Sequence, residues 1–233
     1  MTVPGARVMV VDDEPDILRA LRASLGHHGY QVLSAANGRE ALELLAQGEP
    51  DALVVDLGLP QIDGLELIRR VRATSSLPIV VLSVHDDERT KIEALDLGAD
   101  DYVTKPFSVQ ELMARLRAAL RRAPPGDASG RSVLRAGPIA LEPETRRVTV
   151  DGREVHLTPI EYDLLRVMIG QPNKVFTHRM LLERVWGGAY TAAAHYLHVH
   201  VGNLRRKVEP NPRAPRYLVT EPGVGYRIRP DEP

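Results

Sequence analysis

Acidic side chains stand directly after two apolar runs in the first half of the chain. Asp12 and Asp13 follow Val8–Val11, and Asp56 follows Ala52–Val55. Sites in open α/β sheets form at the carboxyl ends of parallel strands, so these three carboxylates are expected to meet at one edge. Such like charges repel unless a cation neutralises them. Mg²⁺ prefers oxygen ligands and keeps waters that phosphate oxygens can replace, so the pattern predicts a magnesium site primed for phosphoryl transfer.

A simpler alternative is that the acidic run caps the following helix, because Asp13 precedes Pro15 and proline is favoured in a first helical turn. Two later strand ends favour the phosphate site. Ser83 and Lys105 each directly follow an apolar run. A hydroxyl and an ammonium beside three carboxylates form a set of groups that binds a phosphoryl group.

The elements that must position these residues alternate along the first half. Short apolar runs separated by helical patterns imply βαβ units and a parallel sheet buried on both faces. We therefore predict an α/β fold, a doubly wound (βα)5 parallel sheet. The expected strands are Val8–Val11, Val32–Ala35, Ala52–Val55, Ile79–Leu82 and Asp101–Thr104, and the expected helices are about Ile17–Leu25, Arg39–Leu45, Leu65–Val71, Lys91–Leu97 and Gln110–Leu120.

Bulk properties narrow the class of protein. The 233 residues are enough for two ordinary domains, and the absence of cysteine excludes disulfides and thiolate metal sites. No apolar run approaches the ~18–20 residues needed to span a bilayer, so we expect no membrane partner. The first residues, MTVPGAR, have no apolar core of a signal peptide, and we expect a cytoplasmic protein.

Charge divides the chain into two parts. Residues 1–130 carry 14 Lys and Arg against 20 Asp and Glu, whereas residues 131–233 carry 16 against 11. A basic second half suggests a polyanionic partner. Between the halves, the Pro- and Gly-containing segment RRAPPGDASGR reads as a linker. We expect one domain over residues 5–123, a linker over 124–132 and a second domain over 133–230.

The second half changes pattern to short strands followed by helices. Asp151-Gly152 between Val150 and Val155 is a β-hairpin signal. Three helix patterns follow, and the chain closes with RYLVTEPGVGYRI, two β runs around a Pro-Gly turn. The expected helices are Pro159–Gly170, His178–Val185 and Ala193–Glu209.

The last of these helices has an apolar stripe with basic and amide side chains beside it. Leu197, Val201, Leu204 and Val208 recur at helical spacing. A basic face opposite such a stripe suits a recognition helix in a DNA major groove. Three neighbouring histidines also allow a zinc site, but no other ligand cluster accompanies them. The candidate DNA contacts are His195, His198, Asn203, Arg205, Arg206 and, in the terminal hairpin, Arg227.

Four segments in order, VVDDEPD, VVDLGLPQIDGLEL, VLS and GADDYVTKPF, make the first half resemble the receiver domain of two-component response regulators. The resemblance implies that a sensor histidine kinase phosphorylates Asp56. It also implies a cis Lys105–Pro106 bond and a tyrosine, Tyr102, that turns inward from solvent after phosphorylation. The Mg²⁺ ligands would be Asp13, Asp56 and the Gly58 carbonyl with Asp12 nearby, and the phosphoryl oxygens would be held by Ser83 and Lys105.

The second half resembles the α+β winged-helix effector of the OmpR/PhoB group, through the segments LTPIEYDLL, LRRKVE and GVGYR. Within that group the whole chain is most similar to the KdpE-type members, through DLGLP in the first half and HYL and YLVTEPGVGYR in the second. This implies a transcription factor that binds promoter DNA, acts with RNA polymerase and forms a homodimer on phosphorylation. It also implies that the protein is a phosphate acceptor and not a turnover enzyme. The implied dimer face comprises Lys91, Asp100, Asp101, Glu111, Arg115 and Arg122.

Two other functions stay open on the residues. A Mg²⁺-dependent phosphatase would also use an aspartate nucleophile such as Asp56. Phosphatases of that kind usually carry a second aspartate two residues later, where this chain has Gly58. A regulator that acts by protein contact alone would not need the basic helix and terminal hairpin. The target promoters, the kinase and the stimulus are not fixed by the sequence.

Overall fold

The computed structural model describes residues 5–120, 133–187 and 194–230 of the chain, with side chains from residue 196 in the last range. The chain divides into two compact units, Met1–Arg121 and Arg122–Pro233. The predicted linker lies outside the described residues, and so does Arg122.

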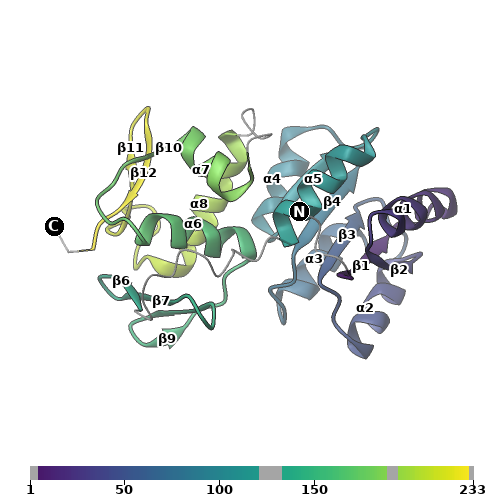
Figure 1. Ribbon diagram of the computed structural model, residues 1–233, viewed down its shortest axis with the longest axis horizontal. Helices are drawn as coiled ribbons and strands as arrows, with labels where there is room; N and C mark the ends of the chain where they lie inside the picture. The colour runs from purple at the N-terminus through teal and green to yellow at the C-terminus, as the bar shows by residue number, and fades with distance from the viewer. Residues whose placement is uncertain (1–4, 121–132, 188–193, 231–233) are drawn as a thin grey trace. The chain divides into compact units, whose positions relative to one another are not determined.

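The first unit is a five-stranded sheet in the order β2-β1-β3-β4-β5, and every pair is parallel (Figure 1). The predicted (βα)5 fold is confirmed, with each predicted element present and its ends moved by at most three residues. The elements are β1 Arg7–Val11, α1 Pro15–His27, β2 Gln31–Ala35, α2 Gly38–Gln47, β3 Ala52–Asp56, α3 Gly64–Arg72, β4 Ile79–Ser83, α4 Glu88–Asp96, β5 Asp101–Thr104 and α5 Val109–Leu120.

The sheet is buried because helices cover it. Alternate strand residues such as Val8, Val10 and Val54 form one core cluster with Leu21 of α1 and Leu116 of α5. The strands β3 and β4 are buried at every residue, as expected for a parallel sheet covered on both faces. The apolar runs therefore read continuously rather than alternating with polar residues.

Three of the helices begin with the same local device. Asn37, Asp63 and Asp87 each accept a hydrogen bond from the backbone N–H three residues on, at the starts of α2, α3 and α4. Each such cap contributes about 0.5–2 kcal/mol to helix stability. The caps fix the loops that follow the strand ends, where the predicted site lies.

The second unit combines two antiparallel sheets with three helices. The strands run in the orders β6-β7-β8-β9 and β10-β12-β11. The predicted hairpin is present, with Asp151 (φ 51°) and Gly152 (φ 76°) both in the left-handed region that a tight hairpin turn requires. The elements are β6 Leu134–Ala136, β7 Ile139–Glu142, β8 Arg147–Val150, β9 Arg153–Glu154, α6 Pro159–Ile169, β10 Phe176–Thr177, α7 His178–Val185, α8 Ala194–Val208, β11 Leu218–Glu221 and β12 Gly225–Ile228.

The core of the second unit lies among the three helices and the terminal hairpin. The predicted stripe of α8, from Leu197 to Val208, is fully within this core. The hairpin pairs closely with β10, since a Cβ at Gly225 would lie 1.9 Å from the carbonyl oxygen of Phe176. Only glycine permits that approach. The helix and hairpin are thereby held as one body, the arrangement of a winged helix.

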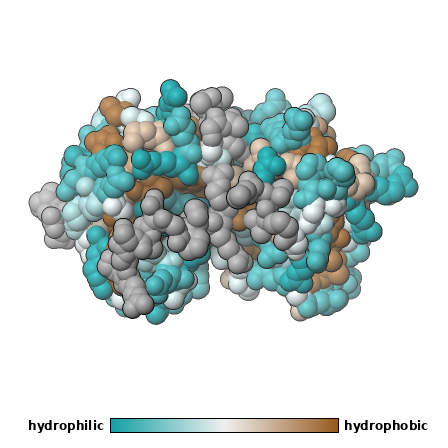
Figure 2. All heavy atoms as spheres, viewed as in Figure 1, coloured by the Kyte–Doolittle hydropathy of each residue, from teal (hydrophilic) through white to brown (hydrophobic). Residues whose placement is uncertain are grey.

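The surface in view is mostly hydrophilic, with hydrophobic side chains gathered in small patches (Figure 2). In the described part of the chain, the helices are all too short or too polar to cross a bilayer.

Candidate functional site

Three strand ends of the first unit bring opposite charges together. The ammonium of Lys105, after β5, lies 2.8 Å from Asp12 Oδ2, after β1, and 3.1 Å from Asp56 Oδ1, at the end of β3. Glu14 Oε1 is 3.9 Å from the same nitrogen. The Asp12 side chain is fully buried, and that of Lys105 is 10% exposed. Asp12, Asp56 and Lys105 therefore lie together at one edge of the sheet, as predicted from the sequence.

The acidic run does not serve as a helix cap. The N-cap of α1 is Glu14, which makes no side-chain capping bond, and Pro15 follows it. Asp12 Oδ1 instead accepts from the Glu14 backbone N–H at 2.9 Å. Asp12 is thus turned toward the sheet edge with both oxygens engaged, while Asp13 is exposed to solvent.

Asp56 presents one oxygen to the lysine and the other to its own loop. Its Oδ2 accepts from the Gly58 backbone N–H at 3.0 Å, and the residue is 7% exposed. Helix α3 begins against it, because a Cβ at Gly64 would lie 2.3 Å from the Asp56 carbonyl oxygen. The carboxylate is therefore held rigidly at the rim rather than on a mobile side chain.

The Lys105 ammonium is stabilised in its charged form. Burial alone would lower the pKa of this amine, but the hydrogen bond that it donates to Asp12 and the charge of Asp56 outweigh burial and raise the pKa above its ordinary value. Lys105 therefore stays positively charged at neutral pH and offsets the repulsion between the two carboxylates.

The donor set at this edge fits a hard cation. Asp12, Asp13 and Asp56 offer carboxylate oxygens and Gly58 a carbonyl oxygen, the ligands Mg²⁺ prefers. Over residues 5–120, 133–187 and 196–230, no three acidic or histidine side chains are already gathered as a metal-binding group. The fit therefore rests on the chemistry and placement of the donors, and the ligand set stays a prediction.

Ser83 and Tyr102 are both held by the loop that follows β4. Ser83 Oγ accepts from the His85 N–H at 3.1 Å, and the Tyr102 hydroxyl donates to the His85 carbonyl at 2.8 Å. Burial raises the pKa of Tyr102, and a hydrogen bond with Ser83 opposes that rise. Tyr102 is 1% exposed, so its side chain points inward in this structure. The predicted cis Lys105–Pro106 bond is present.

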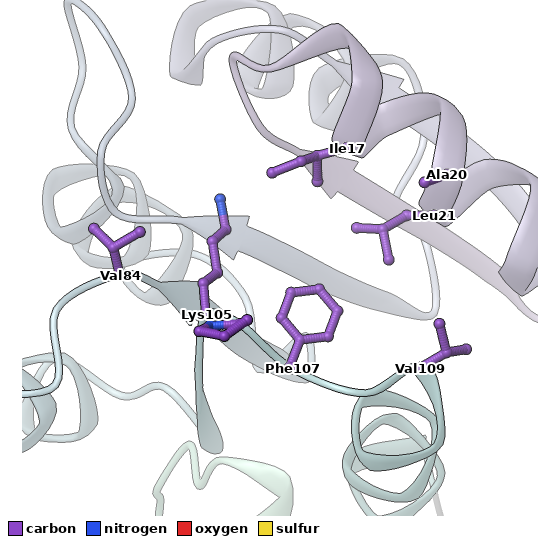
Figure 3. A pocket seen from close by; sticks show the side chains of 8 residues that line it. Ile17, Ala20, Leu21, Val84, Lys105, Phe107 and Val109 are labelled. Atoms are coloured by element: carbon purple, nitrogen blue, oxygen red, sulfur yellow. The ribbon is translucent and has the colours of Figure 1, made fainter.

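Beside Lys105 lies an apolar pocket of about 430 Å³ that sequence reasoning missed. Ile17 and Leu21 of α1 face Phe107 across it, and Lys105 extends along its edge (Figure 3). Val84 is 68% exposed and Val109 is 38% exposed at its rim. The available sequence signal was an apolar residue directly after β4, Val84, and another at the start of α5, Val109.

The described residues of the predicted dimer face are engaged within the chain. Lys91 pairs with Asp86, and Asp100 Oδ2 accepts from Arg72 at 2.9 Å. Arg115 contacts both Asp101, at 2.6 Å, and Glu111, at 2.8 Å. Pairing across a dimer would require exchange of these partners.

The predicted DNA face of α8 is only partly exposed. His198 and Arg206 are exposed, as predicted. Asn203, by contrast, is 4% exposed, so in this structure its side chain is buried rather than presented on the predicted DNA face. Asn203 shares a row of α8 with His200 and Lys207. His200 packs on Trp186, directly after α7, and Lys207 donates a hydrogen bond to Glu161 of α6 at 2.7 Å. That row faces the other two helices.

Two of the three arginines that were expected to reach DNA, Arg205 and Arg227, have protein partners in the terminal hairpin. Arg205 is half-buried, and its guanidinium donates to the Leu218 carbonyl at 2.6 Å and to Thr220 Oγ1 at 2.8 Å. Burial lowers its pKa. Arg227 pairs with Glu221 at 2.6 Å. Both arginines therefore brace the terminal hairpin, and the His195 side chain lies outside the described residues.

Tyr226 and His178 were not predicted, yet they meet His198 at the base of the hairpin. The Tyr226 hydroxyl hydrogen-bonds His198 Nδ1, and the ring of His178 lies 5.1 Å from that of His198. Only the fold brings α7, α8 and β12 together here. The single sequence signal was the polar hydroxyl of Tyr226 at the end of the otherwise apolar segment GVGY.

Comparisons with known proteins agree with both units. Residues 8–117 match the response regulator receiver domain, and residues 152–228 match the C-terminal domain of transcriptional regulatory proteins. The chain is 44% identical to the transcriptional regulatory protein KdpE of Mycobacterium tuberculosis H37Rv, over 95% of this chain and 98% of that protein. It is also 44% identical to the response regulator MprA of Mycolicibacterium vanbaalenii, over 97% and 99%. Equal identity to two differently named regulators leaves the target genes open.

Solved structures give the same architecture. DrrB, an OmpR/PhoB homologue from Thermotoga maritima, aligns over 97% of this chain and 99% of its own, with 27% identity and a TM-score of 0.52. A RitR mutant aligns over 97% and 100%, with 25% identity and a TM-score of 0.79.

Proposed function

Since the chain belongs to the OmpR/PhoB group of response regulator transcription factors, we propose that Asp56 accepts a phosphoryl group from a sensor histidine kinase and thereby controls DNA binding. The observation that carries this proposal is the Lys105 ammonium held between Asp12 and Asp56 at three strand ends. The ammonium is nearly buried and is shared by two carboxylates, of which that of Asp56 is 7% exposed.

In the proposed step, an oxygen of Asp56 attacks the phosphorus of a phosphohistidine on the kinase. A P–O bond forms as the P–N bond breaks, and the imidazole leaves with the electron pair. Lys105 and Ser83 would neutralise and bond the phosphoryl oxygens, which carry most of the charge in such transfers. Mg²⁺, when held by Asp12, Asp13, Asp56 and the Gly58 carbonyl, would supply further neutralisation of that charge.

Loss of the phosphoryl group would follow by water attack on the acyl phosphate, which releases inorganic phosphate and restores the carboxylate. The protein would thus be a stoichiometric acceptor with slow self-dephosphorylation. A dedicated phosphatase is disfavoured, because position 58, where such enzymes usually place an acid, is glycine and donates its N–H to Asp56.

The apolar pocket supports an approach of the kinase from this side. Ile17, Leu21 and Phe107 line it, and Lys105 belongs both to its edge and to the Asp56 site. An apolar helix of the phosphodonor seated there would place its phosphohistidine near Asp56. Burial of apolar surface contributes roughly 25 cal/mol per Å² to such an association.

On phosphorylation, the face of α4, β5 and α5 would join two copies through Lys91, Asp100, Asp101, Glu111, Arg115 and Arg122. The paired winged helices would then bind two half-sites of promoter DNA and act with RNA polymerase in the cytoplasm, where such DNA lies. The exposed His198 and Arg206 on α8 support this use of the helix.

The proposal is tested by adding Mg²⁺ and beryllofluoride, a phosphoryl analogue, to the full chain. Sedimentation should then show a dimer, and retention of duplex DNA should rise. Equal mass and equal retention with and without the analogue would contradict it. Asp56→Ala should respond to neither addition, whereas Asp51→Ala, a change outside the site, should respond as wild type.

A further inference from the structure

One row of side chains on α8 is exposed and has a glycine at its centre. His198 and Arg206 are exposed, and Gly202 lies one turn from each. A Cβ at Gly202 would meet no atom within 4 Å. The row therefore presents an imidazole and a guanidinium with open space between them, so a flat base-pair edge can approach the helix backbone closely.

The imidazole of His198 is fixed in orientation by residues of two other elements. Its Nδ1 is hydrogen-bonded to the hydroxyl of Tyr226 on β12. The ring of His178, at the start of α7, stands edge-on to it at 5.1 Å and edge-on to Tyr226 at 5.6 Å. A ring held in this way can present only its Nε2 side to a ligand.

Tyr226 is itself anchored. It is 4% exposed, and the guanidinium of Arg205 lies 5.6 Å from its ring centre. Arg205 is in turn tied to the hairpin through Leu218 and Thr220. The tyrosine is therefore a fixed support for His198.

The hydrogen bond between Tyr226 and His198 joins two groups that can each donate or accept, and its direction depends on the tautomer of His198. Burial raises the pKa of Tyr226, so the phenol keeps its proton and can donate. With the hydroxyl as donor, Nδ1 accepts, and the proton of a neutral His198 lies on Nε2.

We infer that His198 determines base specificity by donating from Nε2 to the acceptor edge of a guanine, and that Tyr226 is the positioning residue that fixes this donor. The inference rests on the proposed placement of α8 in a major groove. Guanine presents two acceptors there, N7 and O6, whereas cytosine presents a donor and adenine places a donor beside its N7.

The test is selection of bound duplexes from a randomised library by the full chain with Mg²⁺ and beryllofluoride, at one fixed salt concentration. Wild type should select guanine at one position of each half-site. His198→Ala should lose about 5- to 10-fold of discrimination at that position alone. His198→Gln should shift the same position to adenine, because an amide pairs with adenine N6 and N7.

Tyr226→Phe keeps the ring but removes the donor that fixes the tautomer. It should lower the preference for guanine at that one position and leave the other positions as in wild type. Tyr162→Phe, which removes the hydroxyl of another buried tyrosine in the same unit, is the matched control and should change no position.

Either of two results would overturn the inference and leave the proposed function intact. One is unchanged selection by His198→Ala. The other is an equal loss of preference at every position in Tyr226→Phe, as general loosening of the fold would give. If wild type retains no duplex, both the inference and the DNA-binding role of α8 are wrong.

Discussion

At the scale of single residues, Lys105 decides the electrostatics of the receiver site. Its ammonium is shared by Asp12 and Asp56, two carboxylates from strands far apart in sequence. Removing the positive charge leaves the buried oxygens of Asp12 with one fewer donor and leaves two like charges facing each other. The site is thus stabilised by the same residue that would bind the phosphoryl group.

Lys105→Met should lower the free energy of unfolding by about 1–3 kcal/mol near pH 7, because buried acceptors lose a charged donor. The pKa of Lys105 is raised in the folded state. The difference from wild type should therefore be fully present below the ordinary lysine pKa of about 10.4 and disappear as pH rises through the folded-state value. Chemical denaturation between pH 7 and 11 measures it.

Arg19→Met, at an exposed position of α1, is the control and should shift stability little at any pH. A Lys105→Met difference that grows with rising pH would contradict the assigned pairing.

At the scale of elements, α8 divides its basic residues between two tasks. Arg205 holds β11 through Leu218 and Thr220, whereas Arg206 is exposed on the outer row. The sequence alone suggested that both reach DNA. Periodicity gives the stripe that faces the core, but it does not say which neighbouring element meets the residues beside that stripe.

Arg206→Ala should reduce the slope of log binding constant against log salt by about 0.9, the value for one phosphate contact. Arg205→Ala should weaken binding through a displaced hairpin with the slope unchanged. Thr220→Val removes one hydrogen-bond partner of Arg205 without removing a charge. It should also weaken DNA binding with the salt slope unchanged. Salt titrations of duplex binding test all three, and a slope change in Arg205→Ala alone would reverse the assignment.

Much of the receiver site was predictable because it depends on topology. Once parallel strands are inferred, Asp12, Asp56 and Lys105 must share an edge. Partners from distant or irregular segments were not predictable. The pairing of Lys91 with Asp86 depends on the loop after β4, and the burial of Asn203 depends on how α8 packs against α6 and α7. The pocket beside Phe107 depends on side-chain packing between α1 and the loop after β5.

At the scale of the whole molecule, the acidic and basic halves correspond to the two units and two proposed tasks. Coupling between them is proposed to pass through dimerisation. The ion pairs of Arg115 with Asp101 and Glu111 are then the ones to be exchanged between copies. The Asp101 side chain is buried and that of Glu111 is partly exposed. Since exchange replaces each pair by an equivalent one, it gains little free energy, and the dimer should be readily reversible.

Arg115→Ala should weaken the beryllofluoride-induced dimer by up to about 30-fold, because a two-fold dimer would lose the pair twice, up to about 2 kcal/mol. Sedimentation over a concentration series gives the dissociation constant. Arg117→Ala on the same helix is the control. An equal dissociation constant in wild type and Arg115→Ala would exclude this face.

The most direct test of the account is to locate the acyl phosphate chemically. The full chain is incubated with acetyl phosphate and Mg²⁺ and then reduced with borohydride, which converts an aspartyl phosphate to homoserine. Peptide mapping should place homoserine at position 56 in wild type, and Asp56→Asn should yield none. Homoserine at Asp12 or Asp13, or phosphoryl uptake that persists in Asp56→Asn, would contradict the account.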